Sequence, residues 1–363
     1  MEKYRVGIVG ATGMVGQRFI SLLKDHPWFE VNCVAASARS AGKTYREAVG
    51  ERWAFSWEIP EKVAGMTVVD AADIDEVSKH VDFVFCAVDM KKDEIRALEE
   101  AYAKHEIPVV SNNSACRGIE DVPMVVPEIN ADHLAVIEAQ KKRLGTKNGF
   151  IAVKPNCSIQ AYTPALAAWK EFEPREVIVS TYQAISGAGK TFNDWPEMVG
   201  NIIPFISGEE EKSEKEPLKV FGRVDEEKGE IVPFDGPLKI TSQCIRVPVL
   251  NGHTATVFIN FGKNPTKEEL VDRLVNYTSK ASELGLPHAP KQFIQYLTDD
   301  DRPQVKKDVD YEGGMGVSIG RLREDSIFDW KFVGLAHNTL RGAAGGALES
   351  AEMLKALGYI TKK

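Results

Sequence analysis

Residues 4–16 read YRVGIVGATGMVG and decide the fold of the first half of the chain. The first six of these residues, Tyr4–Val9, have the composition of a short buried strand. Apolar residues then recur at helical spacing over Met14–Leu23. The glycines form a G-x-x-G-x-x-G variant of the dinucleotide-binding fingerprint. In that fingerprint Gly10 permits a tight turn, Gly13 lets the backbone approach a pyrophosphate, and Gly16 allows the helix to pack closely on the strand. A strand-turn-helix without a ligand is the alternative interpretation.

Strands and helices alternate through the first part of the chain. Apolar runs predict strands, and segments of helical periodicity lie between some of them. The predicted strands are Tyr4–Val9, Val31–Ala36, Asp82–Val88, Ile107–Ser111 and Phe150–Val153, and the predicted helices are Met14–Leu23 and Lys91–Lys104. This alternation predicts an α/β fold with a parallel, doubly wound sheet of the Rossmann type.

The pattern changes near residue 155. The second part is rich in β-type segments with separate helices, which favours an α+β domain on one antiparallel or mixed sheet. The predicted strands are Glu176–Ala184, Ile240–Val247 and Thr254–Phe261, and the predicted helices are Thr266–Leu284 and an Ala/Gly-rich helix from about Thr339 to Leu357. We therefore expect one domain over residues 1–155 and another over residues 156–337.

The end of the second predicted strand indicates which dinucleotide is bound. Residues 36–43 read ASARSAGK, so no acid stands where an NAD enzyme holds the ribose hydroxyls. Arg39 lies instead near Ser37 and Ser40, a pattern suited to a 2′-phosphate. The sequence favours NADP over NAD, with a plain polar loop as the alternative.

Composition excludes several classes of protein. The chain has 363 residues, 43% hydrophobic and 27% charged, as expected for a globular protein of two domains. A net charge of −8 argues against nucleic-acid binding. The five cysteines are sparse and lack paired metal-ligand spacing, so we expect a reduced, cytoplasmic protein without a metal site. Neither a signal peptide nor a membrane span is expected from the sequence.

Cys157 is the candidate nucleophile. It follows Pro155 and Asn156 at the expected domain junction, and a helix can begin shortly after it, which would favour a thiolate. His253 is a candidate acid or base at the edge of a cleft, although a surface or capping histidine is the bland alternative. A thiol, an imidazole and a dinucleotide site together indicate oxidation or reduction at the acyl level through a thioester.

Three arginines could bind an anionic substrate such as an acyl phosphate. They are Arg117, Arg246 and Arg341.

The chain resembles the aspartate-β-semialdehyde dehydrogenase family over nearly its whole length. The matching segments are GATGMVG at 10–16, DVPMVVPEIN at 121–130, NCS at 156–158, QAISGAG at 183–189, GEEEK at 208–212, RVPVLNGH at 246–253 and HNTLRGAAGG at 337–346. The last segment is similar to the archaeal and fungal branch. The resemblance implies a catalytic and dimerisation domain, and a C-terminal helix (338–363) that returns to complete the NADP-binding domain.

The resemblance also implies residue roles. The reaction would be NADPH-dependent reduction of L-aspartyl-4-phosphate to the semialdehyde, in lysine, threonine and methionine biosynthesis, by a homodimer or homotetramer. The implied catalytic residues are Cys157, His253 and Gln183; the substrate-binding residues are Arg117, Asn156, Glu209, Lys212 and Arg246; and the cofactor-binding residues are Gly10, Thr12, Gly13, Met14, Val15, Ser37, Arg39, Ser40, Ser186, Gly187 and Asn338.

Several alternatives stay open. Without the resemblance, the charged run Glu209–Lys219 would be taken as a solvated helix face. Malonyl-CoA reductase shares the scaffold but would not need Glu209 to hold an amino group. N-acetyl-glutamyl-phosphate reductase is disfavoured because its Gly-Cys-Tyr-Pro segment is absent, and a non-catalytic NADP-binding sensor would not need Cys157 and His253 together. Lys190–Pro196 departs from the loop common in this branch, which leaves its shape and any subunit contacts open.

Overall fold

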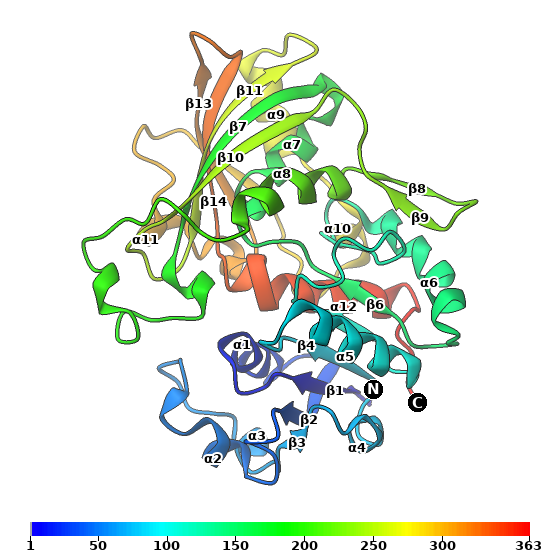
Figure 1. Cartoon of the computed structure of the whole chain (residues 1–363). Helices are drawn as coiled ribbons and strands as arrows, with labels where there is room; N and C mark the ends of the chain where they lie inside the picture. Colours follow the sequence, from blue (N-terminus) through cyan, green and yellow to red (C-terminus); the bar gives the residue numbers. More distant parts are fainter. Residues whose placement is uncertain (1) are drawn as a thin grey trace.

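Two six-stranded sheets organise the molecule, which is described here over residues 2–363 of a computed structural model (Figure 1). The N-terminal sheet is wholly parallel, in the order β3-β2-β1-β4-β5-β6. Its strands are β1 (Tyr4–Val9), β2 (Phe29–Ala36), β3 (Val69–Asp70), β4 (Phe83–Cys86), β5 (Val109–Ser111) and β6 (Ile151–Val153). The order reverses between β1 and β4, as in dinucleotide-binding sheets, and confirms the predicted doubly wound fold.

The helices of this half are α1 (Met14–Leu23), α2 (Tyr45–Val49), α3 (Glu61–Ala64), α4 (Ile74–Ser78), α5 (Lys92–Lys104) and α6 (Ile137–Leu144). The strand β1 and the helix α1 have the predicted bounds. The strand β4 is shorter than the predicted Asp82–Val88, because the chain leaves the sheet at Ala87 to line the cavity described below.

The second sheet is mixed, in the order β10-β7-β11-β14-β13-β12. Its two outer pairs are parallel and the inner pairs antiparallel, so the mixed alternative of the prediction is the observed one. Its strands are β7 (Pro174–Gln183), β10 (Lys239–Arg246), β11 (His253–Phe261), β12 (Ile294–Leu297), β13 (Val317–Glu324) and β14 (Trp330–Ala336); β8 (Arg223–Asp225) and β9 (Glu230–Val232) form a separate hairpin.

The helices of the second half are α7 (Thr163–Ala168), α8 (Glu209–Val220), α9 (Lys267–Val275), α10 (Lys280–Leu284), α11 (Val305–Asp308) and α12 (Gly345–Ala356). The prediction of one helix over Thr266–Leu284 is wrong, because the segment breaks between α9 and α10. Ser279 caps α10 by accepting the backbone N–H of Ser282, and the Tyr277 hydroxyl donates to the carbonyl of Glu128. These side-chain bonds compensate for the interrupted helix.

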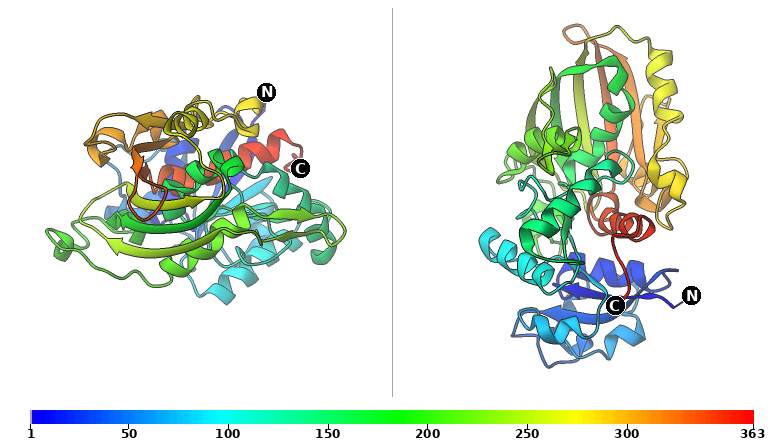
Figure 2. Two further views of the ribbon diagram at one scale, coloured as in Figure 1. Left: turned by 90° about the horizontal axis from the view of Figure 1, so that it is seen from above. Right: turned by 90° about the vertical axis from the view of Figure 1, so that its right-hand side faces the viewer.

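The C-terminal helix returns to the N-terminal sheet, as predicted. Figures 1 and 2 show α12 in red between the two sheets, with both chain termini at the N-terminal half. Ala347, Leu348 and Leu354 pack in one buried cluster with Phe19 and Phe85. The helix starts as a π-helical turn over Leu340–Ala344, with Thr339 as its N-cap, and the predicted bounds of about Thr339 to Leu357 agree with it; the turn is interrupted at Ala343. This turn lies beside the end of β6 and therefore shapes the junction between the halves.

Within residues 2–363, no helix combines the length and the apolar character needed to cross a membrane.

Candidate active site

The candidate nucleophile and the candidate imidazole meet at the junction of the two halves. Cys157 follows β6 and immediately precedes a 3-10 turn, Ser158–Ala161. His253 begins β11 and is completely buried. The Cys157 Sγ lies 3.3 Å from the His253 Nε2, although the two residues are 96 positions apart in the chain.

Backbone geometry selects the tautomer of His253. The N–H of Ala184, just after β7, donates to the His253 Nδ1 over 3.0 Å. The Nδ1 therefore carries a lone pair, and the proton of the neutral ring is on Nε2, facing Cys157. Burial and then Arg246 lower the pKa of His253 to about 3, so the ring is neutral near pH 7.

Two glycines leave space around this pair. A Cβ at Gly342 would lie 2.7 Å from the Cys157 Cβ. A Cβ at Gly187 would lie 3.0 Å from the Arg246 Nη1 and 3.1 Å from the His253 Cε1. A larger residue at Gly342 would force the Cys157 segment to shift, and one at Gly187 would crowd Arg246 and His253.

Glu209 collects several of the predicted residues around one carboxylate. It is the first residue of α8 and only 8% exposed. Its oxygens accept from Asn156 Nδ2 at 2.9 and 3.0 Å and from Lys212 Nζ at 2.7 Å. The Gln183 Nε2 adds a longer bond of 3.4 Å. Burial alone would raise the pKa of Glu209, but Lys212 and Asn156 hold it below its ordinary value.

The interpretation of Glu209–Lys219 as a solvated face is therefore wrong for one side of α8. Polar side chains at helical spacing, Glu209, Ser213 and Glu216, face inward and are buried. Ser213 receives a hydrogen bond from, or donates one to, Ser158 at 3.0 Å. The helix presents polar groups where a core helix would present apolar ones, which is typical of a binding site.

Arg117 lies at the same junction. Its Nη1 bonds Glu216 Oε1 at 2.9 Å, and its Nη2 donates to the carbonyl of Asn112 at 3.2 Å. Its buried Nε has no hydrogen-bond partner in the described part of the chain. The second oxygen of Glu216 accepts the backbone N–H of Asn156. Glu216 thus orients both Arg117 and Asn156, and the unsatisfied nitrogen suits an incoming anion.

Arg246 is buried and its Nη1 donates to the carbonyl of Ala184 at 2.6 Å. Ala184 also donates its N–H to His253, so one backbone residue binds both side chains. The strands β7, β10 and β11 therefore position the guanidinium and the imidazole together. Burial lowers the pKa of Arg246, while a Cys157 thiolate and the Glu209 carboxylate oppose the shift.

Arg341 does not belong to the site. It is fully buried and bonded to Glu128 and Glu349, and its Nε donates to the carbonyl of Met315 at 2.8 Å. Two carboxylates already satisfy the guanidinium, so the interpretation of Arg341 as an anion-binding group is wrong. Its bonds hold the π-helical turn at the start of the C-terminal helix.

The glycine turn opens into a cavity of about 570 Å³. A Cβ at Gly10, whose φ is +91°, would lie 2.3 Å from the carbonyl oxygen of Ala87, so only glycine fits the turn. A Cβ at Gly16 would meet the Gly10 oxygen at 2.3 Å. Gly13 is the N-cap of α1, where a Cβ would meet only the Gly10 oxygen at an ordinary 3.5 Å, so its absence leaves the helix N-terminus free for a phosphate to approach.

The cavity lining suits an anionic dinucleotide with an additional phosphate. Three cations, Arg39, Lys43 and Arg52, line it against one carboxylate, Asp89, among the described lining residues. The predicted contacts in the lining are Gly10, Thr12, Gly13, Ser37, Arg39 and Ser40. Lys43 and Arg52 were missed by the sequence prediction, although Lys43 stands in the segment used for it.

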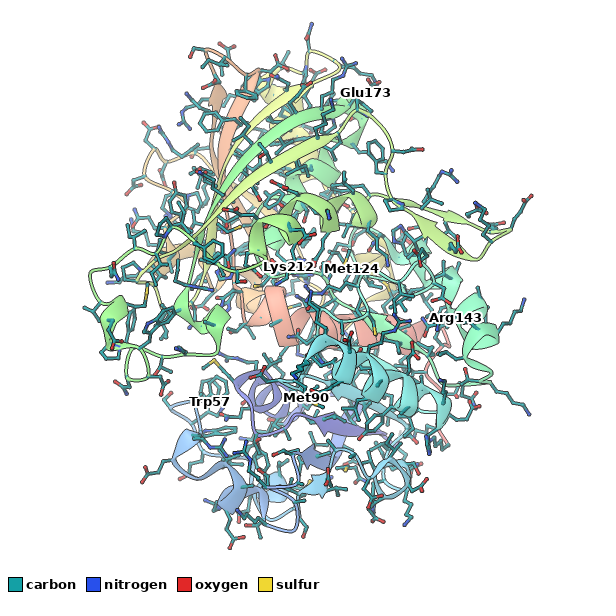
Figure 3. The ribbon with its side chains drawn as sticks, in the orientation of Figure 1. Trp57, Met90, Met124, Arg143, Glu173 and Lys212 are labelled. Atoms are coloured by element: carbon teal, nitrogen blue, oxygen red, sulfur yellow. The ribbon has the colours of Figure 1, made fainter. Side chains whose placement is uncertain are left out.

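The remaining predicted cofactor residues lie outside the first cavity, in three different settings. Met14 lines a neighbouring cavity of about 580 Å³ together with Thr191 and Asp194 of the atypical loop. Val15 packs partly against the core instead of lining either cavity. Asn338 donates to the Ser186 Oγ at 2.8 Å and accepts the N–H of Gly252 at 2.8 Å. Figure 3 labels Met90, which lines the first cavity in the lower half, and Lys212, in the upper half.

One group outside this junction has the composition of a metal site. His26, His288 and Glu352 bring ligand atoms within 4.8 Å of one another. However, the backbone N–H groups of Trp28 and Phe29 both donate to the His26 Nδ1. The neutral His26 therefore carries its proton on Nε2, which bonds Glu352 at 2.8 Å and has no lone pair for a cation.

The chain is similar to known proteins over both halves of the molecule. Two family profiles match: "Semialdehyde dehydrogenase, NAD binding domain" at residues 5–137 and "Semialdehyde dehydrogenase, dimerisation domain" at residues 165–341. The aspartate-semialdehyde dehydrogenase of Archaeoglobus fulgidus is 40% identical over 97% of this chain and 98% of the relative. That of Methanothermobacter thermautotrophicus is 42% identical over 96% and 98%.

A solved structure supports the same relationship. The crystal structure of aspartate semialdehyde dehydrogenase with NADP from Candida albicans superposes with a TM-score of 0.88 at 38% identity, covering 99% of this chain and 100% of that one. Archaeal and fungal relatives are thus both similar to this chain, as the last predicted motif indicated. The alternatives of a malonyl-CoA reductase and of a non-catalytic sensor are not favoured.

Proposed function

The chain belongs to the aspartate-semialdehyde dehydrogenase family, and from that membership we propose how its own residues carry out the reaction. The activity is NADP-dependent reduction of L-aspartyl-4-phosphate to L-aspartate-4-semialdehyde and phosphate, in the aspartate pathway. The observation that carries the proposed residue roles is the 3.3 Å contact between Cys157 Sγ and His253 Nε2 at the junction of the two halves.

Cys157 is proposed to attack the acyl carbon of the substrate. The new S–C bond replaces the C–O bond to phosphate, which leaves with the proton that the overall reduction consumes. When bound, NADPH would supply the hydride that brings the resulting thioester to the aldehyde level. The S–C bond then breaks and returns the electron pair to Cys157, so the thiolate is regenerated.

His253 is proposed to act through its Nε2–H. The sequence predicted a general acid or base, and the hydrogen bond from Ala184 favours the donor half of that role. A donor 3.3 Å from the sulfur can stabilise the thiolate before attack and the carbonyl oxygen as it gains charge. A ring with its proton on Nε2 cannot accept the thiol proton there.

The two charged groups on the α-carbon of the substrate are proposed to bind side chains of opposite charge. Arg246 would hold the α-carboxylate, and Glu209 the α-ammonium. An ammonium already occupies Glu209, because Lys212 Nζ lies 2.7 Å from its Oε1. We infer that the substrate ammonium replaces Lys212, which then turns to the phosphate beside Arg117 and Asn156.

The cofactor is proposed to lie along the glycine turn, with Arg39 at the 2′-phosphate. The spacing of Gly10, Gly13 and Gly16 and the excess of positive charge in the cavity support this placement. Ser186, Gly187 and Asn338 would bind the nicotinamide end, since they lie next to His253 and Arg246.

The domain boundaries are also a proposal. Residues 1–155 with 338–363 would form the NADP-binding domain, and residues 156–337 the catalytic and dimerisation domain. The returning helix α12 and the switch from a parallel to a mixed sheet support this division.

The outer face of the second sheet is proposed as the interface of a homo-oligomer. Ile178 pairs with Phe258 across β7 and β11, and Ile178 is 40% exposed. Ile178 and the half-buried Phe258 form an apolar pair on the outer face of the sheet, which a second copy could cover. We propose a dimer built on this face, and a tetramer as its further association. Five unpaired cysteines fit a reducing, cytoplasmic setting.

A reverse assay tests the activity. Aspartate semialdehyde, phosphate and NADP should together give NADPH, and omission of phosphate should abolish turnover. Succinate semialdehyde lacks the α-amino group and is therefore the matched substrate that tests whether Glu209 binds the α-ammonium. Equal turnover of both substrates would contradict the proposed role of Glu209.

A further inference from the structure

Lys154 is a buried ammonium without a carboxylate partner. The residue is 3% exposed and immediately follows β6. Its Nζ donates to the backbone carbonyls of Pro155 and Gly342, and it forms no ion pair with any described residue. Burying a cation in this way is costly, so its retention calls for a compensating negative group.

The two carbonyls lie on either side of Cys157. Pro155 precedes the cysteine by two residues, and Gly342 belongs to the π-helical turn that touches the Cys157 Cβ. Lys154 therefore fastens together the two backbone segments that enclose the nucleophile. Arg341 supports the same turn from the other side through Glu128 and Glu349.

The charges around Cys157 indicate that its thiolate is the negative group that compensates for the buried Lys154. Burial raises the pKa of the Cys157 thiol and Glu209 raises it further, whereas Lys154, then Arg117 and Arg246, lower it. Lys154 is thus the leading group that favours the thiolate.

The environment of Lys154 gives the reciprocal result. Burial lowers the pKa of Lys154 to about 7, and Arg117 and Arg341 act in the same direction. The Cys157 thiolate and Glu216 oppose that shift. Ammonium and thiolate therefore stabilise each other.

His253 does not replace this charge. Its ring is neutral, and its Nε2 already carries a proton, so it contributes a hydrogen bond to the sulfur and not a net positive charge. The ionisation of Cys157 then depends on the cations around it, and Lys154 carries its charge below about pH 7.

We propose that Lys154 is a positioning residue for the nucleophile: it holds the Cys157 turn against the C-terminal helix and supplies the positive charge that favours the thiolate. The inference rests on the proposed function only in taking Cys157 as the nucleophile. The ionisation of the thiol can be measured whether or not Cys157 takes part in turnover.

The test is the pH dependence of Cys157 alkylation by iodoacetamide in the full-length protein, read by mass spectrometry. Lys154→Gln removes the charge but keeps a donor for the carbonyls, and Lys154→Met removes both. Below about pH 7, where Lys154 of the parent protein is charged, loss of that charge should raise the effective pKa of the thiol by about one unit, so that alkylation of each variant is about tenfold slower. If the charge of Lys154 matters more than its hydrogen bonds to the two carbonyls, the thiol pKa should rise equally in the two variants.

Lys219→Gln is the matched control. Lys219 is also buried, and its Nζ donates to the backbone carbonyls of Arg117, Ile119 and Val122, while the Arg117 guanidinium is held separately by Glu216. Its removal should lower the stability but leave the thiol pKa unchanged. An unshifted pKa in folded Lys154→Gln, an equal shift in Lys219→Gln, or failure of both Lys154 variants to fold would each overturn the proposal. Turnover by Cys157→Ser would instead overturn the proposed function and leave this result standing.

Discussion

The cofactor cavity and the catalytic junction are built in different ways. The cavity is formed by backbone turns at the ends of neighbouring strands, and its cationic side chains, such as Arg39, are partly open to solvent. The junction is formed by buried side chains from distant segments, with Glu209, Arg246 and His253 each less than a tenth exposed. Charges in the junction are therefore much less screened than those in the cavity. We expect substitutions in the junction to have large effects and those in the cavity to have graded ones.

The largest effect is expected at the centre of the junction. Cys157→Ser should lower kcat by roughly 10³-fold or more, because a serine hydroxyl beside a neutral imidazole is a far weaker nucleophile. NADP affinity should stay unchanged, since the glycine turn is built independently. Mass spectrometry of protein trapped with substrate should show the acyl adduct on Cys157. An adduct on Cys116 or Cys244 would contradict the comparison.

The imidazole should come next. His253→Ala should lower kcat by roughly 10²–10⁴-fold, measured in the reverse assay at saturating NADP. The loss should be in kcat more than in KM, because the Nε2–H acts on charge that develops during reaction. Retention of more than a tenth of the activity would remove His253 from the site.

The neutral state of His253 also makes a prediction for stability. Its folded pKa is about 3 against an ordinary 6.5, so between these values the unfolded chain binds the extra proton. The wild-type protein should therefore lose unfolding free energy as the pH falls from 6.5 to 4.5. His253→Gln should lose roughly 2–3 kcal/mol less over the same interval, by urea unfolding. Equal losses in both proteins would mean that His253 titrates normally when folded.

Glu209 and Glu211 allow a buried carboxylate to be compared with an exposed one on the same helix, α8. Glu209→Ala should lower kcat/KM for aspartate semialdehyde by about 10–150-fold, the scale of a charge-assisted bond to the substrate ammonium. Glu211→Ala is the control, because Glu211 is exposed and pairs with the exposed Lys215. It should leave kcat/KM unchanged. Similar values for the two variants would make α8 a surface helix in function.

The smallest effect is expected in the cavity. Arg39→Ala should weaken NADPH by about 5–30-fold and leave NADH nearly unchanged, as a partly screened contact to the 2′-phosphate would do. Titration of cofactor fluorescence measures both affinities, and Arg46→Ala, an exposed arginine paired with Glu61, is the control. Equal losses for both cofactors would place Arg39 on the shared part of the molecule.

The sequence could predict the cavity because its elements are local. Gly10, Gly13 and Gly16 stand within seven consecutive residues, from the turn after β1 into the first residues of α1, and the conformation of Gly10 admits no other residue. The bounds of β1 and α1 were correct for the same reason. The break after α9 was not predicted, because the hydrogen bond of Tyr277 to Glu128 crosses 149 positions and overrides a continuous helical pattern.

The junction was predictable only in part. The residue pattern proposed Cys157 and His253, and the resemblance added Glu209, but the residues that hold them in place were missed. Glu216 had a signal, since its spacing from Glu209 and Ser213 puts it on one helix face. Lys154 had another, as a lone charge at the end of an apolar strand, which delivers its side chain to the edge of the sheet where sites form.

By itself, the sequence determined the strand-turn-helix of the cofactor site, the change of pattern near residue 155 and the types of chemistry available to the chain, because these depend on neighbouring residues and on composition. Tertiary structure alone decided which charges are buried together. The tautomer of His253, the inward face of α8 and the pairing of Lys154 with the Cys157 turn all arise from contacts between segments far apart in the chain. The strength of a charge depends on the solvent that such contacts exclude, which no local pattern records.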